Sequence, residues 1–320
     1  MRKYILLLLI FIYGFALTGC GADILDREEG YASSSLSRFL TSDQMRTFEA
    51  ENAVSAEQER YLAFGAFVLT NNRESIRVFA LGESGNQADR ILRDFWGVDS
   101  HETALEQLES LSGAAGQSPV ADDIFHRFIK NGHLEPLNPV ELFLSDFDLA
   151  GLENLYAATV RRAERMTYEF EMFMAELGAL EEEREEVFEF FVLMLLADRV
   201  NHGLDAYQGA REMLVESFGF TEEELLNIPT LAAWDYGRVA IIARYGVAAG
   251  YLEEEEAWEH LRKAANYAAD TYSSWREYTA AHILGRAIAF GNSSTDFRDT
   301  LNFLLNHPES SFQNINFRDG

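Results

Sequence analysis

Three charged side chains are the first candidates for chemistry in this sequence. Asp235 and Arg238 lie three positions apart in an apolar stretch, so on a helix they would share one stripe and could form an ion pair. Arg286 falls on a second predicted helix, on a face that we expect to point inward. Buried charges must be paired, because an unpaired one costs several kcal/mol. Two hypotheses follow: a structural ion-pair network of the three residues, or a pocket in which they bind a small anionic ligand.

Aromatic residues accompany these charges. They would form a lid over an ion-pair network, or the walls of a pocket. On the second helix Trp275, His282 and Arg286 recur at spacings of seven and four, which places them on one face, and Gly285 allows a neighbouring helix to approach closely. The candidate cluster consists of Trp234, Asp235, Arg238, Tyr272, Trp275, His282 and Arg286.

The common catalytic and metal-binding motifs are absent from the sequence. No histidine has a glutamate three residues before it, as a carboxylate-bridged metal bundle requires, and there is no zinc-protease, nucleophile-elbow or phosphate-loop motif. We therefore expect no metal and no cofactor, and we interpret Ser273 and Ser274 as helix caps rather than nucleophiles. Glutamates are abundant enough to leave one enzymatic alternative open, the hydrolysis of an envelope glycan by two carboxylates.

The N-terminus has the layout of a bacterial lipoprotein signal. A basic start precedes an apolar segment at residues 4–16, which is too short to span a bilayer as a permanent helix. The run Leu-Thr-Gly-Cys then ends at Cys20 and resembles a lipobox. The resemblance implies a mature chain that begins at Cys20 and is anchored by several acyl chains, which hold a protein stably at a membrane. Because Gly21 rather than Asp follows, we expect the outer membrane in a Gram-negative envelope.

The mature chain would be strongly acidic. Without residues 1–19 it has 24 basic and 53 acidic residues, a formal charge of −29. This surface charge disfavours nucleic acid as a partner. The partners that we expect are the membrane, through lipidated Cys20, and an envelope protein or a small anionic ligand. Since Cys20 is the only cysteine, the mature chain forms no disulfide and depends on a hydrophobic core.

Apolar residues recur at helical spacing from about residue 41 onward. One helix is predicted over 156–177, with Gly178 as its C-terminal cap, and the next begins at residues 181–183 and is apolar on nearly all sides at 187–197, which indicates a central position. Capping-box signatures occur at Ser55 with Gln58, Asp99 with Glu102, Thr221 with Glu224 and Ser274 with Glu277. Strand patterns are nearly absent. We predict an all-α fold, a compact array of about a dozen short to medium helices.

The expected organisation is a signal peptide at residues 1–19, a lipidated tether at 20–40 and a helical domain at 41–320. The tether is assigned from its small and polar residues with little periodicity. Residues 113–119 are the most loop-like interior stretch and would mark a boundary if there is one. A single domain and two packed helical lobes both agree with this pattern.

A series of motifs between residues 231 and 291 has a distinctive order and spacing. The motifs are Ala233–Arg238, Arg244–Leu252, Glu256–Trp258, Tyr272–Trp275 and Leu284–Arg286. Together they resemble a bacterial family, the domain of unknown function 1266. Residues 91–111 look like the upstream block of that family, so the family-like core would span about 90–300. The resemblance implies a bacterial helical protein without an assigned activity or ligand.

These observations define the functional hypotheses. We favour a lipid-anchored envelope protein whose helical domain is not an enzyme and binds a protein or small ligand. The alternative is a cell-wall glycan hydrolase that uses carboxylates outside any known motif.

Overall fold

The computed structural model describes residues 33–145 and 147–318. These residues form α-helices joined by loops, and their only β pairing is an isolated antiparallel bridge between Ala53 and Val78. The predicted all-α class is confirmed. The predicted signal peptide and Cys20 lie outside the described residues.

In the described part of the chain, no helix is both long and apolar enough to cross a membrane.

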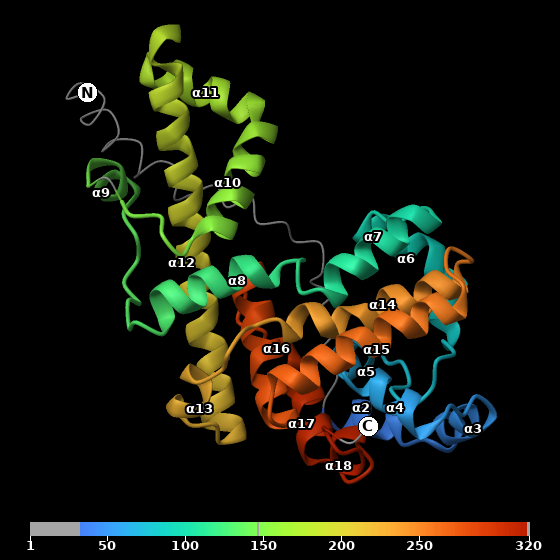
Figure 1. Cartoon of the computed structure of the whole chain (residues 1–320). Helices are drawn as coiled ribbons and strands as arrows, with labels where there is room; N and C mark the ends of the chain where they lie inside the picture. Colours follow the sequence, from blue (N-terminus) through green and yellow to red (C-terminus); the bar gives the residue numbers. More distant parts are fainter. Residues whose placement is uncertain (1–32, 146, 319–320) are drawn as a thin grey trace.

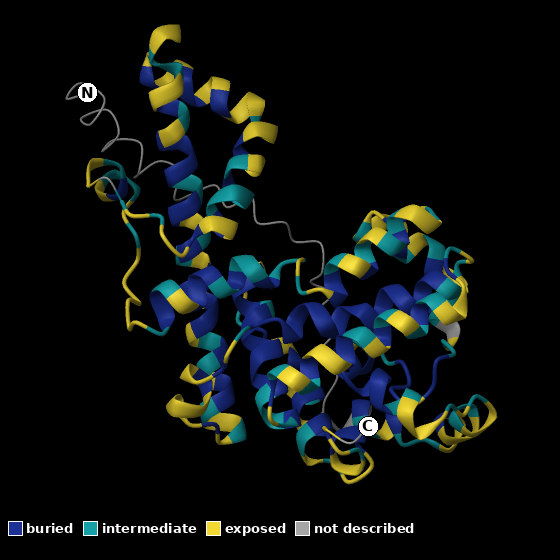
Figure 2. Cartoon of the chain, in the orientation of Figure 1, coloured by how far each residue is buried: buried dark blue, intermediate teal, exposed yellow. Residues whose placement is uncertain are grey.

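A large lobe is built around α14 (Ala233–Ala248). Every residue of α14 from Ala233 to Gly246 is buried, as Figure 2 shows by its nearly continuous buried colour. Its neighbours include α5 (Ala66–Asn71), α6 (Ala88–Trp96), α7 (His101–Ser112), α15 (Glu254–Thr271) and α16 (Trp275–Phe290). A helix covered from all sides requires apolar residues all round, which explains its sequence pattern.

A smaller lobe projects from this body, and we call it the arm (Figure 1). It consists of α9 (Pro139–Leu144), α10 (Glu153–Arg165), α11 (Thr167–Leu177) and the N-terminal half of α12 (Arg184–Phe218). The arm has a hydrophobic cluster of its own, which extends from Ala163 to Val192 along the chain. The C-terminal half of α12 packs on α16. The described residues thus form two packed helical lobes that share one helix.

The remaining helices complete the large lobe, and most of them contribute buried residues to its core. They are α2 (Ser33–Leu40), α3 (Asp43–Glu51), α4 (Ala56–Ala63), α8 (Ser118–Ile124), α13 (Glu222–Leu226), α17 (Arg298–Asn306) and α18 (Ser311–Asn314). Short 3₁₀ segments lie at Glu83–Gln87, Glu181–Glu183 and Thr295–Phe297, and a π-helical turn at Phe125–Ile129 follows α8.

Two helix predictions need correction. The helix predicted over 156–177 is broken at Met166, where ψ is 49°. The break allows α10 to pack on α8 and α12 while α11 folds over the start of α12. The helix that follows has 35 residues and is therefore not short to medium, because nothing stops it before Gly219, which adopts φ 64°. Gly178 ends α11 with φ 60°, as predicted.

The capping predictions hold in part. The boxes at Ser55 with Gln58 and at Thr221 with Glu224 are present. The prediction for Asp99 was wrong by one residue, since Ser100 caps α7 and Thr103 completes the box.

The range assigned to the tether contains part of the large lobe. Ser33–Leu40 forms α2, which packs on α17 with Leu36 and Leu40 buried. These two leucines are one helical turn apart, and this short spacing is the signal that the tether assignment missed.

Candidate functional site

Asp235 is completely buried and accepts hydrogen bonds from a distant loop. The backbone N–H groups of Gly116, Gln117 and Ser118 donate to its carboxylate at 3.0, 3.1 and 3.1 Å. Arg238 adds an ion pair on the same carboxylate. Asp235 therefore caps the N-terminus of α8 from across the core, and four donors satisfy its charge. The loop that the sequence suggested as a boundary is held in the core by this residue.

Arg238 is also buried, although slightly less than its partner Asp235. Its Nη1 donates to Gln117 Oε1 at 3.2 Å, and the same oxygen accepts from Trp234 Nε1 at 3.0 Å. The guanidinium lies over the Trp234 ring, 4.5 Å from its centre, and 5.7 Å from that of Trp96. Burial lowers the pKa of Arg238, and Asp235 opposes this shift. The arrangement is a closed ion pair between aromatic rings.

Arg286 is directed to a different carboxylate. It pairs with Asp296 at 3.2 Å and donates to Asn292 at 2.8 Å and Ser294 at 2.9 Å. Its guanidinium also lies 4.3 Å from the centre of the Phe297 ring. These partners come from the loop after α16, so Arg286 fastens that loop to the end of its own helix. The structure thus brings Asp235 and Arg238 together as predicted and gives Arg286 another partner.

The aromatic members of the predicted cluster serve the packing of α14 and α16. Tyr272 accepts from the N–H of Ala233 and donates to the carbonyl of Thr230, both at 2.9 Å, so it fixes the start of α14. Trp275 donates to the carbonyl of Ile315 at 2.7 Å.

His282 lies in the same core without access to solvent. Its ring stacks on Phe67 with 4.7 Å between ring centres, and its Nδ1 bonds to the carbonyl of Ala233 at 3.1 Å. Burial lowers its pKa to about 3. The imidazole is therefore neutral at physiological pH and belongs to the core.

Sequence reasoning missed a second buried cation, Arg244. It donates to the carbonyls of Ser75 at 2.9 Å, Phe79 at 2.8 Å and Ala80, and it lies 3.8 Å from Glu74. Burial lowers its pKa to about 10, and Glu74 opposes this shift. Arg244 anchors the loop between α5 and α6 on α14. The only sequence signal was a charge in an otherwise apolar helix, since its partners are more than 160 residues away.

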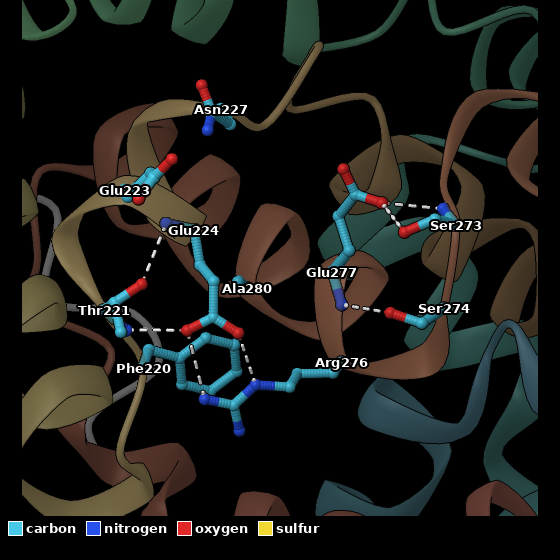
Figure 3. Close-up of a pocket in the computed structure, with 10 residues that line it drawn as sticks. All are labelled: Phe220, Thr221, Glu223, Glu224, Asn227, Ser273, Ser274, Arg276, Glu277 and Ala280. Atoms are coloured by element: carbon cyan, nitrogen blue, oxygen red, sulfur yellow. Dashed lines mark hydrogen bonds and ion pairs between the residues drawn. The ribbon is translucent and has the colours of Figure 1, made fainter.

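A pocket of about 340 Å³ lies where α13 meets the N-terminus of α16 (Figure 3). It is lined by Phe220, Thr221, Glu223, Glu224, Asn227, Ser273, Ser274, Arg276, Glu277 and Ala280. Ser274 caps α16 as predicted by accepting from the N–H of Glu277, whereas Ser273, predicted as a second cap, precedes the cap position and donates its hydroxyl to Glu277. The described residues contain no group of three or more His, Cys, Asp or Glu side chains placed to hold a metal ion.

The pocket contains more carboxylates than cations. Arg276 binds Glu224, with 2.9 Å between Nε and Oε1, and also lies over the Phe220 ring at 3.7 Å. Arg276 and the Thr221 N–H lower the pKa of Glu224 to about 2, so it stays ionised. Glu277 accepts from the Ser273 N–H at 2.6 Å, and the Glu223 side chain is exposed (Figure 3). Arg276 thus balances one carboxylate, while Glu223 and Glu277 form no ion pair with any described residue.

Comparison with known proteins identifies a family that matches most of the chain. Residues 91–317 match the family described as "Protein of unknown function (DUF1266)". The chain belongs to the DUF1266 family. A segment of 60 residues is 40% identical to the "Uncharacterized protein YbeR" of Escherichia coli (strain K12), which covers 18% of this chain and 24% of YbeR. The chain thus spans about a quarter of the length of this curated relative. No solved structure matches the chain significantly.

Most of the motifs that suggested DUF1266 contain residues that hold the fold together. Asp235, Arg244 and Tyr272 each hold a segment from elsewhere in the chain, as described above. Gly285 lets α16 approach α14, since a Cβ there would lie 2.8 Å from the carbonyl oxygen of Leu231. The pocket also lies within the DUF1266 region, but it is built from side chains outside most of these motifs.

Proposed function

We propose that this DUF1266 protein is a lipid-anchored binding protein of the bacterial envelope, without enzymatic activity, that binds a cationic side chain of a partner protein in the pocket between α13 and α16. The observation that carries the proposal is the excess of carboxylates over cations in this pocket. Its anchor is inferred from the N-terminal sequence that ends at Cys20.

The pocket suits an ammonium or guanidinium group. Glu223 and Glu277 contribute two negative charges that no arginine or lysine of the described residues balances. Asn227 adds a side-chain amide at the same rim. A volume of about 340 Å³ holds one long side chain and little more. Because Glu223 is exposed and Glu277 is only half-buried, each contact is weak, and we expect most of the affinity to come from the surrounding surface of the partner.

An anionic ligand is less well supported. The cations proposed for it were Arg238 and Arg286, and each now has a carboxylate partner, Asp235 or Asp296. A ligand would have to displace that partner. In the case of Asp235 this would leave a buried carboxylate without its ion pair.

Glycan hydrolysis also receives little support from this pocket. A general acid must hold a proton near neutral pH, whereas the pKa of Glu224 is lowered to about 2. Burial raises the pKa values of Glu49 and Asp122, but Glu49 bonds to Ser75, and Asp122 to Thr230 and Leu231, outside the pocket. We therefore favour binding over hydrolysis.

The test is a titration of the protein with the peptide Gly-Arg-Gly, followed by NMR on the side-chain amide signal of Asn227. We expect saturable shifts that Gly-Glu-Gly does not produce. Glu223→Gln removes one charge without removing a bond, so it should weaken binding by about five- to tenfold, equivalent to about 1 kcal/mol or somewhat more. Glu106→Gln, an exposed site on α7, is the matched control and should bind like the parent. Equal affinity of the two variants would contradict the proposal.

A further inference from the structure

Three of the five residues of α13 hold this short helix in place. Glu222 pairs with Arg211 of α12, with 2.7 Å between Oε2 and Nε. Glu224 pairs with Arg276 of α16, as described above. Leu225 is 0% exposed and belongs to the core. Because ion pairs to two different helices and a buried leucine fix α13, its outer face is preformed and loses little conformational freedom when a partner binds.

The outer face of α13 carries side chains that the fold leaves unused. The side chains of Glu223 and Asn227 are exposed and form no hydrogen bond or ion pair with another residue of the described chain. Leu226 lies between them in the sequence and is 37% exposed. Spacings of three and four residues place Leu226 and Asn227 on the same side of a helix as Glu223. This side therefore offers a carboxylate, an amide and an apolar side chain to solvent.

Leu226 lies beside the mouth of the pocket. Glu223 and Asn227 line the pocket, whereas Leu226 does not. With about 3.6 residues per turn, Asn227 lies about 40° to one side of Glu223 and Leu226 about 60° to the other side. Leu226 thus continues the surface of α13 beyond the pocket. A single exposed leucine is ordinary on a protein surface, so it is the position next to the cation site that distinguishes this one.

The opposite wall of the pocket provides one free carboxylate oxygen. Oε2 of Glu277 accepts from the Ser273 N–H at 2.6 Å and from the Ser273 hydroxyl. Oε1 of Glu277 has no hydrogen-bond partner among the described residues, and Figure 3 shows it directed away from Ser273. A cation bound by both this oxygen and Glu223 would lie between α13 and α16. The chain that carries the cation can then pass over α13 and cover Leu226.

These two contacts identify the class of partner. A free amine or a polyamine would use the carboxylates but leave Leu226 in water. A peptide in extended conformation directs the side chains of residues i and i+2 to one face, about 6.5 Å apart. Side chains one turn apart on a helix, such as Glu223 and Leu226, are separated by about 5–6 Å. An extended segment can therefore place a cationic side chain in the pocket and an aliphatic one on Leu226.

We propose that the partner binds through an extended segment in which a cationic side chain enters the pocket and an aliphatic side chain two positions away packs on Leu226. The inference rests on the cation binding proposed above and adds the sequence pattern that the site would select. Because the contact with Leu226 is apolar, its contribution should persist at high salt, whereas salt screens the attraction of the exposed carboxylates.

The test compares peptides that differ only beside the arginine. The full chain is titrated with Gly-Arg-Gly-Leu-Gly, with its reverse Gly-Leu-Gly-Arg-Gly, and with the two peptides in which serine replaces leucine, and the side-chain amide signal of Asn227 is followed by NMR. We expect at least one leucine peptide to bind about fivefold more tightly than its serine counterpart, because part of a leucine side chain is buried. If the serine peptides bind and leucine adds nothing, this inference is overturned while the cation site stands. If no peptide binds, both are overturned.

Leu226→Ser tests the contact itself. Its affinity for the tighter leucine peptide should fall about fivefold, to that of the serine peptide, because the apolar contact is lost. Leu144→Ser removes an exposed leucine from α9 of the arm and is the matched control, which should bind like the parent. Both leucines are exposed, so the fold should tolerate either change. A Leu226→Ser variant that keeps the full preference for leucine would show that leucine binds elsewhere and would reject the proposed contact.

Discussion

At the scale of single residues, the central feature is how far the fold supplies each charged side chain with partners. Asp235 accepts three backbone N–H groups and an arginine, whereas Arg286 pairs with Asp296 at an edge where the aspartate side chain is 59% exposed. The two sites look alike in the sequence, since both are charges in apolar helices. They differ in how many buried partner groups lose their hydrogen bond or ion pair when the side chain is removed.

We predict that Asp235→Ala lowers the free energy of unfolding by about 3–5 kcal/mol, because it strands Arg238 and uncaps α8. Arg286→Ala should cost only about 1–2 kcal/mol, since its partner is solvated. Urea unfolding of both variants beside the parent measures the difference. Equal losses, or an Asp235 variant as stable as the parent, would show that this carboxylate does not support the core.

The neutral state of His282 predicts a pH dependence. Its pKa is about 3 in the folded chain and 6.5 in an unperturbed histidine, so the unfolded chain binds more protons between these values. Stability should fall as the pH drops from 6.5 towards 3, by up to about 1.4 kcal/mol per pH unit, and this contribution should be constant above 6.5.

The matching variant for this prediction is His282→Gln, which cannot titrate. Its stability should fall less steeply than that of the parent over the same pH range, whatever its stability at neutral pH. Parallel curves from urea unfolding at several pH values would mean that another group is responsible.

At the scale of elements, close contacts between helices depend on small residues. A Cβ at Gly285 would meet the carbonyl oxygen of Leu231 at 2.8 Å and Cβ of Trp234 at 2.9 Å, neither of which can move without shifting α14. Gly285→Ala should therefore lower stability by about 1–3 kcal/mol, although alanine is the better helix former. At Gly203 the nearest atoms are isoleucine methyl groups at 3.2 and 3.3 Å, so Gly203→Ala should cost clearly less. Thermal unfolding of both variants measures these losses of stability. A Gly285→Ala variant more stable than the parent would contradict the close approach of α16 to the start of α14.

The same scale shows what the sequence could predict and what it could not. The helical period around α14 and α16, and the cap at Ser274, are local signals and were predicted correctly. The break at Met166 has no local cause of this kind, because it depends on the packing of α10 and α11 against other helices. The backbone partners of Asp235 lie about 118 residues earlier in the chain, and the arginine partner of Glu224 lies 52 residues later. No periodicity within one segment reports contacts at such separations.

At the scale of the whole molecule, the proposed lipid anchor would determine where the protein acts. We predict that Cys20→Ala releases the protein from the membrane fraction or leaves it unprocessed, because the proposed acylation and cleavage would both need this cysteine. Fractionation and intact mass of the parent and the variant provide the measurement. A mature parent chain without acyl groups would contradict the lipoprotein assignment.

The length of α12 gives the molecule a mechanical property. Its 35 residues correspond to a rod of about 52 Å, which starts beneath α11 and ends at Gly219, directly before Phe220 in the wall of the pocket. A continuous helix resists bending, so a tilt at one end displaces the other. A movement of the arm is therefore expected to displace Phe220 and α13 as well. A partner that reorients the arm on binding should therefore change the affinity of the pocket, and occupancy of the pocket should change the affinity for that partner by the same factor.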